Sequence, residues 1–318
     1  MLRSGVRNFF TPVVFVKHGA AAAGARATMR LMTTRSSSSS DGSYPCDGAV
    51  RRAFTVNGLT LRGLEWPAPG RPALCFLHGG SAHAHWFDAV VPAFQGRYHI
   101  LSLDQRGHGE SDWSAGPAYA TEDFASDLLG VMDALGWERM ALVGHSMGGH
   151  NAMAFAAWHP ARLSALCVVD SRPAIPSDRL HSMHRRGHRG PRRHESLESA
   201  LRSFRLLPPE TTADPALLDH LSRQGIAERE GQFMYRFDPA CNGTRRPADA
   251  WLLLPRITAP TLLVRGEHSP ILPPVMAQEM AACITISQVV EIPRAHHHLV
   301  LDEPKAFAAA LGGFLATT

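Results

Sequence analysis

The feature that most constrains the fold is the segment from Met140 to Trp158. Residues 140–143 form an apolar run typical of a buried strand, and residues 151–158 have the composition of a helix. Between them lies a Gly-x-Ser-x-Gly motif with Ser146 at its centre. A serine in such a sharp turn is strained, and the two glycines leave room for the neighbouring backbone. The segment therefore predicts a strand–turn–helix unit whose serine hydroxyl stands clear of a sheet.

The chain on both sides of this unit alternates strand and helix patterns. Residues 51–56 and 59–66, separated by Asn57-Gly58, predict a hairpin with a two-residue loop. Strands are expected at residues 73–77, 98–103, 165–169, 261–264 and 285–292, and helices at residues 84–94, 121–136, 274–282 and 304–315. Several strands are wholly apolar, as in a sheet covered on both faces. The order of elements predicts an α/β fold with a mostly parallel sheet and right-handed crossovers.

Residues 171–255 interrupt this alternation. The segment is rich in Pro, Arg and His, shows no strand pattern of the kind seen elsewhere, and has helix patterns at 196–206 and 215–227. An insertion of this length in an α/β domain is most simply a helical cap over the site. We therefore expect a core formed by residues 49–170 and 256–318, with a cap formed by residues 171–255.

Residues 1–40 have a composition of their own. They hold six of the 32 basic residues and none of the 28 acidic ones, so the rest of the chain carries 26 basic against 28 acidic residues. This balance gives no general case for nucleic-acid binding. The Arg-, Ala- and Ser-rich composition predicts an organellar targeting segment, mitochondrial in the first place, with a plastid or secretory signal as alternatives. No apolar stretch approaches the roughly 20 residues that span a bilayer.

The five cysteines are scattered and show no metal-ligand spacing. Cys75 and Cys167 fall within expected buried strands, where a thiol acts as a small apolar side chain. We expect no disulfide framework, and a reducing compartment fits this usage best.

Nucleophilic chemistry at Ser146 requires a base, and the base requires an orienting acid. If the order along the chain is serine, acid, histidine, the base lies near the C-terminal end of the sequence. The candidates are His296, His297 and His298, which follow the last expected strand.

Four motifs occur in a family-specific order. They are His78-Gly79-Gly80, the Asp-Gln-Arg-Gly-His-Gly loop at 104–109, the turn at 144–149 and Pro-Arg-Ala-His-His at 293–297. Together they resemble the α/β-hydrolase superfamily of serine esterases and lipases over about residues 50–316. The resemblance implies a mostly parallel central sheet flanked by helices, with an inserted helical cap. It implies that His297 is the base, with the Gly80 and Met147 N–H groups forming the oxyanion hole.

The acid departs from the common pattern of this family. Many members carry an aspartate in a Gly-x-x-Asp loop, but here Ser269 stands at that position in the loop at 266–270. Asp170 ends the strand after the Ser146 helix, and the carboxyl ends of parallel strands share one edge of the sheet. A branch of the superfamily that resembles small acyl-ester hydrolases uses this position. We favour Asp170 over Glu267, which lies within the loop itself.

These residues predict a serine hydrolase that cleaves a carboxylic ester or thioester through an acyl-enzyme on Ser146. Alternatives are a C–C bond hydrolase or cofactor-free haloperoxidase of the same fold, and a non-catalytic ligand-binding member. Dehalogenases and epoxide hydrolases of this fold carry aspartate where this chain has Ser146. We expect a small-molecule acyl substrate, with no cofactor, metal ion, nucleic acid or integral membrane segment.

The cap contains a strongly basic segment at residues 184–194. One interpretation is a clamp for an anionic group, such as the phosphates of an acyl-CoA. The other, which we favour, is an exposed basic loop made flexible by its Gly and Pro residues.

Overall fold

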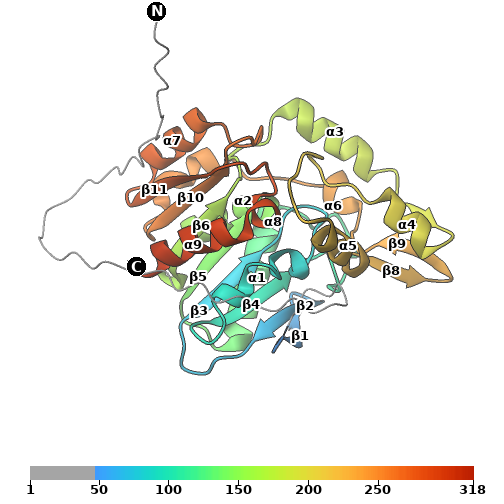
Figure 1. The fold of residues 1–318 in the computed structure, drawn as a ribbon, viewed down its shortest axis with the longest axis horizontal. Coiled ribbons are helices and arrows are strands. Elements are labelled where there is room, and N and C mark those ends of the chain that lie inside the picture. The colour runs from blue at the N-terminus through green and yellow to red at the C-terminus, as the bar shows by residue number, and fades with distance from the viewer. Residues whose placement is uncertain (1–46) are drawn as a thin grey trace, which may run out of the picture.

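A computed structural model describes residues 47–318. Its main sheet has eight strands in the order β1-β2-β4-β3-β5-β6-β10-β11 (Figure 1). The strands are β1 Val50–Val56, β2 Leu59–Trp66, β3 Ala73–Leu77, β4 His99–Asp104, β5 Met140–His145, β6 Leu163–Val169, β10 Thr261–Gly266 and β11 Ser287–Ile292. The strands from β4 to β11 pair in parallel, whereas β2 pairs antiparallel with both β1 and β4. The prediction of a mostly parallel sheet is confirmed.

Helices cover both faces of this sheet. The core helices are α1 Thr121–Leu135, α2 Met147–Trp158, α7 Pro274–Cys283, α8 Leu299–Asp302 and α9 Pro304–Leu315. Short 3-10 helices occur at η1 Ala84–Phe87, η2 Val91–Ala93, η3 Pro160–Arg162, η4 Ala250–Leu252 and η5 Leu254–Arg256. The hairpin turn at Asn57 and Gly58 has positive φ at both residues, as a two-residue type I′ loop requires.

Strand β3 shows how the sheet is buried. Cys75 and Leu77 belong to the core cluster that includes side chains of α1, α2 and α7. Leu74 and Phe76 point the other way, into the cluster built with η1, η2 and α9. Successive side chains of a strand face opposite sides, so an entirely apolar strand is the expected sequence for a sheet covered on both faces.

The segment between β6 and β10 lies beside the sheet's carboxyl edge, to the right in Figure 1. Its elements are α3 Ser177–Gly187, β7 Arg193–His194, α4 Leu197–Ser203, α5 Pro215–Gln224, β8 Ile226–Arg229, β9 Gln232–Tyr235 and α6 Ala240–Gly243. Strands β7, β9 and β8 form a small antiparallel sheet. The expectation of a cap without strands is therefore wrong. These strands have two to four residues with one buried residue each, so they lack the apolar pattern of a core strand.

Two local predictions are also corrected. The expected helix at residues 84–94 is a pair of 3-10 turns, η1 and η2, because Pro92, the second residue of η2, has no N–H to continue a helix from η1. Thr121 is the first residue of α1 and not its cap. The N–H of Ala120 instead donates to the Asp123 carboxylate, and the Thr121 hydroxyl accepts from the Ala248 N–H.

Three further expectations concern membrane-spanning segments, the cysteines and the targeting segment. In the described part of the chain, no helix is long and apolar enough to cross a membrane. Cys75, Cys167 and Cys241 are buried free thiols, as the strand positions of the first two predicted. The expected targeting segment at residues 1–40 lies outside the described residues.

Candidate active site

Ser146 occupies the sharp turn between β5 and α2. Its backbone has φ 54° and ψ −116°, a strained conformation for a residue with a side chain. A Cβ on Gly144 would lie 2.3 Å from the Gly148 carbonyl oxygen, and one on Gly148 would lie 2.3 Å from the Leu77 carbonyl oxygen. Glycine is therefore required on both sides of the serine, because α2 packs directly against the ends of β3 and β5.

A chain of hydrogen bonds links Ser146 to a buried carboxylate. His297 Nε2 lies 3.1 Å from Ser146 Oγ, and His297 Nδ1 lies 2.6 Å from Asp170 Oδ2. The ring and carboxylate are buried, with His297 3 % and Asp170 0 % exposed. The structure thus brings together the three residues that the motifs singled out, although His297 and Asp170 lie 127 positions apart.

Asp170 follows β6 and has its own set of donors. Its backbone has φ 45°, and its N–H donates to the Val264 carbonyl oxygen at 2.7 Å. The Ser269 hydroxyl donates to Asp170 Oδ2, and the Gly266 N–H lies 3.3 Å from Asp170 Oδ1. Ser269 therefore stands beside the carboxylate and orients it.

Glu267, the alternative acid, lies elsewhere. Its side chain is exposed, and Oε2 accepts a hydrogen bond of 2.7 Å from the Arg294 N–H. The geometry places Asp170, and not Glu267, against the histidine.

The other histidines nearby are engaged in structural contacts. His298 Nε2 lies 3.0 Å from the Pro208 carbonyl oxygen of the cap, and burial lowers the pKa of His298 to about 3. His145 Nε2 donates to the His297 carbonyl oxygen at 2.9 Å, and burial lowers the pKa of His145 well below its usual range. His296 contributes its backbone N–H, which donates to Asp302 at 2.8 Å. Of the three consecutive histidines, only the His297 ring lies between Ser146 and Asp170.

Gly80 lies close to Met147, the residue that follows the serine. A Cβ on Gly80 would lie 4.0 Å from the Met147 side chain. Met147 is the first residue of α2, so its N–H has no acceptor within the helix. Gly80 and Met147 both line the same cavity as Ser146 and His297.

This cavity has a volume of about 210 Å³ and lies between core and cap. The core contributes Gly80, Ser146 and Ile271 to its wall, and the cap contributes Ser171, Arg172, Met183, Leu207 and Asn242. The space is large enough for a small organic molecule, since a water molecule occupies about 30 Å³.

Comparison with known proteins assigns the family. The family model for the alpha/beta hydrolase fold matches residues 72–304. The chain belongs to the α/β-hydrolases. This membership is consistent with the sheet order, the turn at Ser146 and the insertion after β6.

Individual relatives of this α/β-hydrolase are distant but cover most of it. A 2-(acetamidomethylene)succinate hydrolase from Mesorhizobium japonicum is 25% identical over 85% of this chain and 96% of its own. An sn-1-specific diacylglycerol lipase from Mus musculus is 28% identical over 77% and 81%, respectively. The crystal structure of an E-2-(acetamidomethylene)succinate hydrolase has a TM-score of 0.74 at 23% identity, covering 84% of this chain and 99% of that one. These relatives are hydrolases, and the similarity supports an enzyme of this type.

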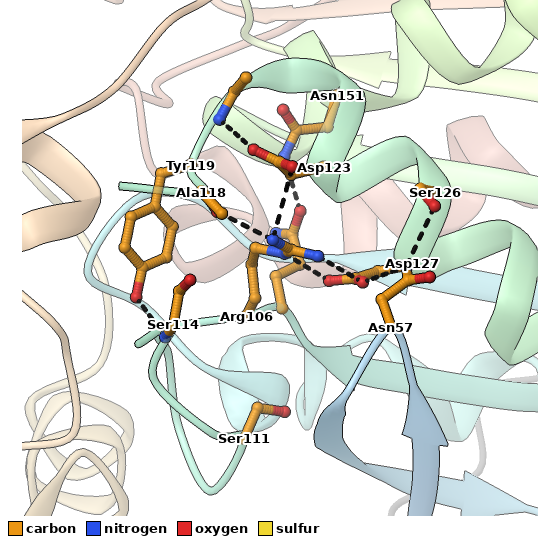
Figure 2. A network of polar contacts seen from close by, with 12 residues as sticks. Asn57, Arg106, Ser111, Ser114, Ala118, Tyr119, Asp123, Ser126, Asp127 and Asn151 are labelled. Carbon is orange, nitrogen blue, oxygen red and sulfur yellow. Dashed lines mark hydrogen bonds and ion pairs between the residues drawn. The ribbon is translucent and has the colours of Figure 1, made fainter. Parts of the chain in front are cut away.

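A buried polar network supports the loop after β4 in this α/β-hydrolase. Arg106 donates to both Asp127 carboxylate oxygens at 2.6 Å and to the Ala118 carbonyl oxygen at 2.8 Å (Figure 2). Asn57 of the hairpin turn also donates to Asp127, at 2.9 Å. The bidentate ion pair explains the geometry of the loop without a direct role for Arg106 at Ser146.

A second set of bonds starts at His78, next to the glycines of the Gly79-Gly80 loop. The side-chain nitrogen Nε2 of Gln105 donates to the His78 carbonyl oxygen at 2.8 Å, and Asn151 Nδ2 donates to Gln105 Oε1 at 2.8 Å. Asn151 Oδ1 then accepts from Arg245 Nη2 at 2.8 Å. Each amide is thereby fixed in orientation, and the bonds run from the loop behind Gly80 to a guanidinium in the cavity wall.

Two groups of side chains in the described residues have atoms close enough to share a metal ion. In the first, His297 already bonds Ser146 and Asp170, and His145 and His298 bond carbonyl oxygens. In the second, His85 Nδ1 and His220 Nε2 each lie 2.8 Å from Asp88 Oδ2, joining the cap helix α5 to η1. The observed bonds give each group a structural explanation.

Two residues of the site were not predicted from the sequence. In the sequence, Ser269 is notable only because it occupies the position where the family usually has aspartate. In the structure, its hydroxyl donates a hydrogen bond to Asp170. Arg245 lies in the segment 244–247 (Thr-Arg-Arg-Pro), whose composition is typical of a polar loop. No local signal distinguishes it from exposed arginines of the cap, since only its tertiary environment buries it.

Proposed function

We propose that this protein is a serine hydrolase that cleaves a carboxylic ester or thioester through an acyl-enzyme on Ser146. The observation that carries the proposal is the hydrogen-bonded series from Ser146 Oγ through His297 to Asp170, set in a strained turn beside a cavity. The similarity to a diacylglycerol lipase, an ester hydrolase by name, supports the choice of an ester.

In the proposed mechanism His297 Nε2 accepts the Ser146 proton as Oγ attacks the substrate carbonyl carbon. Asp170 accepts a hydrogen bond from His297 Nδ1–H, which holds the ring and stabilises the imidazolium that forms. The N–H groups of Gly80 and Met147 donate to the oxyanion of the tetrahedral intermediate. His297 then protonates the leaving alcohol or thiol. Water, deprotonated by the same histidine, releases the acid and regenerates Ser146.

The test is covalent labelling of the full chain with an uncharged fluorophosphonate probe, which phosphonylates activated serines. Labelling of the wild type and its loss in Ser146→Ala are the expected results. Serine at position 111 provides a matched control: Ser111 is buried and its hydroxyl binds the Asp104 carbonyl oxygen, so Ser111→Ala should leave labelling intact. Absence of labelling in the folded wild type would contradict the proposal and favour a non-catalytic, ligand-binding protein.

Hydrolysis of a panel of neutral esters and thioesters of increasing acyl length then identifies the preferred acyl group. The apolar part of the cavity wall includes Ile175, Met183, Leu207 and Ile271, and the cavity is small, so short and medium acyl chains should be preferred over long ones. A preference for C–C bond cleavage over ester cleavage would overturn the ester assignment while leaving the triad in place.

A further inference from the structure

The wall of the cavity beside Ser146 carries an excess of positive charge. Arg172, Arg179, Arg186 and Arg245 all line it, and no acidic residue does so among residues 47–318. Guanidinium groups without carboxylates raise the local concentration of anions, and low-dielectric walls strengthen the effect. The cavity is therefore suited to a ligand that brings its own negative charge.

Arg245 is the most informative of these residues because it is buried. Its side chain is 2 % exposed, and within the described chain no carboxylate oxygen comes within 4.0 Å of its guanidinium. Nη2 donates to Asn151 Oδ1 at 2.8 Å, and the guanidinium carbon lies 4.8 Å from the centre of the Phe124 ring. A buried cation held only by neutral groups is unfavourable for folding, because water no longer solvates it.

The acidic side chains with the strongest electrostatic effect on Arg245 do not form an ion pair with it. Asp123 pairs with Arg106 at 3.7 Å and accepts from the Ala120 N–H, and Glu122 is exposed on α1. The positive charge of Arg245 also affects its neighbour in the cavity wall. Burial first, and Arg245 second, lower the pKa of His150 to about 4, so His150 is neutral at neutral pH and adds no second positive charge there.

Hydrogen bonds to neutral oxygen atoms fix the orientation of the Arg245 guanidinium. Asn151 donates through Nδ2 to Gln105, so only its oxygen is turned to the guanidinium. The Tyr119 carbonyl oxygen lies 3.5 Å from Arg245 Nη1. A guanidinium has five N–H donors, and these two contacts use one on each terminal nitrogen of Arg245, which also lines the cavity.

The remaining arginines lie nearer to solvent. Arg179 and Arg186 are exposed on α3, and with Met183 between them they follow the i, i+4, i+7 spacing of one helix face. Arg172 is held by the Ile271 carbonyl oxygen, at 3.1 Å from Nε and 2.8 Å from Nη2. Positive charge thus extends from the exposed side of the cavity to Arg245 in its wall.

We propose that the substrate carries a carboxylate besides the bond that is cleaved: Arg245 binds this carboxylate, and Arg179 and Arg186 attract it at the exposed side. The inference rests on the proposed function in taking Ser146 as the reacting group. It narrows the substrate class to monoesters or monothioesters of small dicarboxylic acids, and related acyl compounds with a free carboxylate. The planar fork of arginine matches a carboxylate with two parallel hydrogen bonds.

Binding to Arg245 is tested without catalysis. Isothermal titration calorimetry at low salt compares glutarate with its neutral counterpart glutaramide in wild type, Arg245→Gln and Arg205→Gln. Glutarate should bind the wild type at least about tenfold more tightly than glutaramide, and Arg245→Gln should remove that difference. Arg205 is an exposed cap arginine outside the cavity wall, so Arg205→Gln should bind like the wild type.

Equal binding of glutarate and glutaramide by the wild type would overturn the proposal. So would an undiminished preference in folded Arg245→Gln. A titration with inorganic phosphate separates the two sources of negative charge: Arg245-dependent binding of phosphate without binding of glutarate would overturn the carboxylate assignment. Should Arg245→Gln fail to fold by circular dichroism, the exposed double variant Arg179→Gln/Arg186→Gln decides. It should weaken glutarate binding several-fold at low salt and less at high salt, and unchanged affinity would contradict the proposal.

Catalysis is tested separately with monomethyl glutarate and methyl 4-carbamoylbutanoate, which differ by a carboxylate and an amide. The wild type should hydrolyse the first with a kcat/KM at least about tenfold higher, mainly through KM, and Arg245→Gln should lose this preference. Labelling of Ser146 by the uncharged fluorophosphonate should persist in Arg245→Gln. A labelled wild type without preference between the esters rejects the carboxylate subsite alone, whereas an unlabelled wild type that still binds glutarate through Arg245 rejects the hydrolase alone.

Discussion

Asp170 Oδ2 lies 2.6 Å from His297 Nδ1 and also accepts a hydrogen bond from the Ser269 hydroxyl. Two donors on one oxygen fix the plane of the carboxylate, and the Gly266 N–H approaches the other oxygen. This arrangement gives Ser269 a positioning role in a loop where many α/β-hydrolases carry the acid. The loop still contacts the carboxylate beside His297, although that carboxylate comes from the end of the neighbouring strand.

Replacement of Asp170 by Asn should reduce kcat about ten-thousand-fold, because the amide favours the wrong tautomer of His297 and cannot stabilise its charged form. Steady-state hydrolysis of the best ester found in the panel provides the measurement. Glu267→Gln is the matched control, since Glu267 is exposed and bonds the Arg294 N–H; it should retain wild-type kcat. The reverse pattern of losses would move the acid to Glu267.

The elements that carry the site are β3, β5 and β6, which are adjacent in the sheet. Strand β3 is followed by the Gly79-Gly80 loop, β5 by Ser146 and β6 by Asp170. The chain leaves β3 for β4 on one side and returns to β5 on the other, and a crevice opens where connections diverge in this way. The close contact of α2 with the end of β3 sets the height of Ser146 above the sheet.

Gly148→Ala should disturb this contact. The new Cβ would lie 2.3 Å from the Leu77 carbonyl oxygen and 2.6 Å from that of His78, and backbone of a central strand cannot easily move away. We expect a loss of about 1–3 kcal/mol in the free energy of unfolding, measured by urea titration, together with reduced labelling of Ser146.

The control for this variant is Gly313→Ala in α9. Gly313 is exposed and a Cβ there meets no atom within 4 Å, so helix propensity should stabilise the protein by about 0.5–1 kcal/mol. Equal effects of the two substitutions would show that steric contact with β3 is not what requires Gly148.

At the scale of the whole molecule, burial of histidine is the main pH-sensitive feature. Burial lowers the pKa of His83 to about 3 and that of His108 to about 4, and it places the pKa of His78 well below the usual range. His145, His150 and His298 are lowered in the same way. These side chains lie at the core–cap boundary and near Ser146, so protonation would place charges inside the protein.

Stability should therefore fall as the pH decreases below about 6.5. A histidine whose folded pKa is lowered takes up a proton in the unfolded chain first, so its contribution is complete above 6.5 and is lost towards its folded pKa. Asp104 acts in the opposite sense: burial raises its pKa to about 6, so it favours folding as the pH falls from 6 to 4. The combined effect of the six histidines on the free energy of unfolding should exceed the opposite effect of the single aspartate.

Urea unfolding at pH 7.5, 6.5, 5.5 and 4.5 measures this dependence through the midpoint. A midpoint that stays constant or rises on acidification would contradict the neutral burial of these histidines.

Targeting is a further property of the whole chain, and residues 1–40 are proposed to direct import into mitochondria. A fluorescent protein fused after residue 40 should accumulate in that organelle, because the segment is basic and has no acidic residues. Changing its six basic residues to Gln should abolish import. A fusion that remains in the cytosol would contradict the proposal, and one found in plastids or the medium would support the alternative signals.

Local sequence patterns determined most of the core secondary structure of this protein. Apolar runs, glycine spacing and turn residues act between neighbours in the chain, so they located the core strands, the hairpin and the turn at Ser146. The motifs also predicted that Gly80 and Met147 lie beside the serine. The patterns failed where elements are short, as in η1 and η2 and in the strands of the cap, because two to four residues do not establish a period.

Only the tertiary structure placed Asp170, and not Glu267, beside His297, and only it revealed that Arg245 is buried. The choice between Asp170 and Glu267 depends on how β6, β10 and the His297 loop meet in space, across 127 positions of sequence. Whether an arginine is solvated or buried depends on the side chains that other elements pack around it, and Arg245 is enclosed by α1, α2 and the cap. Both facts are properties of long-range packing, which local residue patterns do not encode.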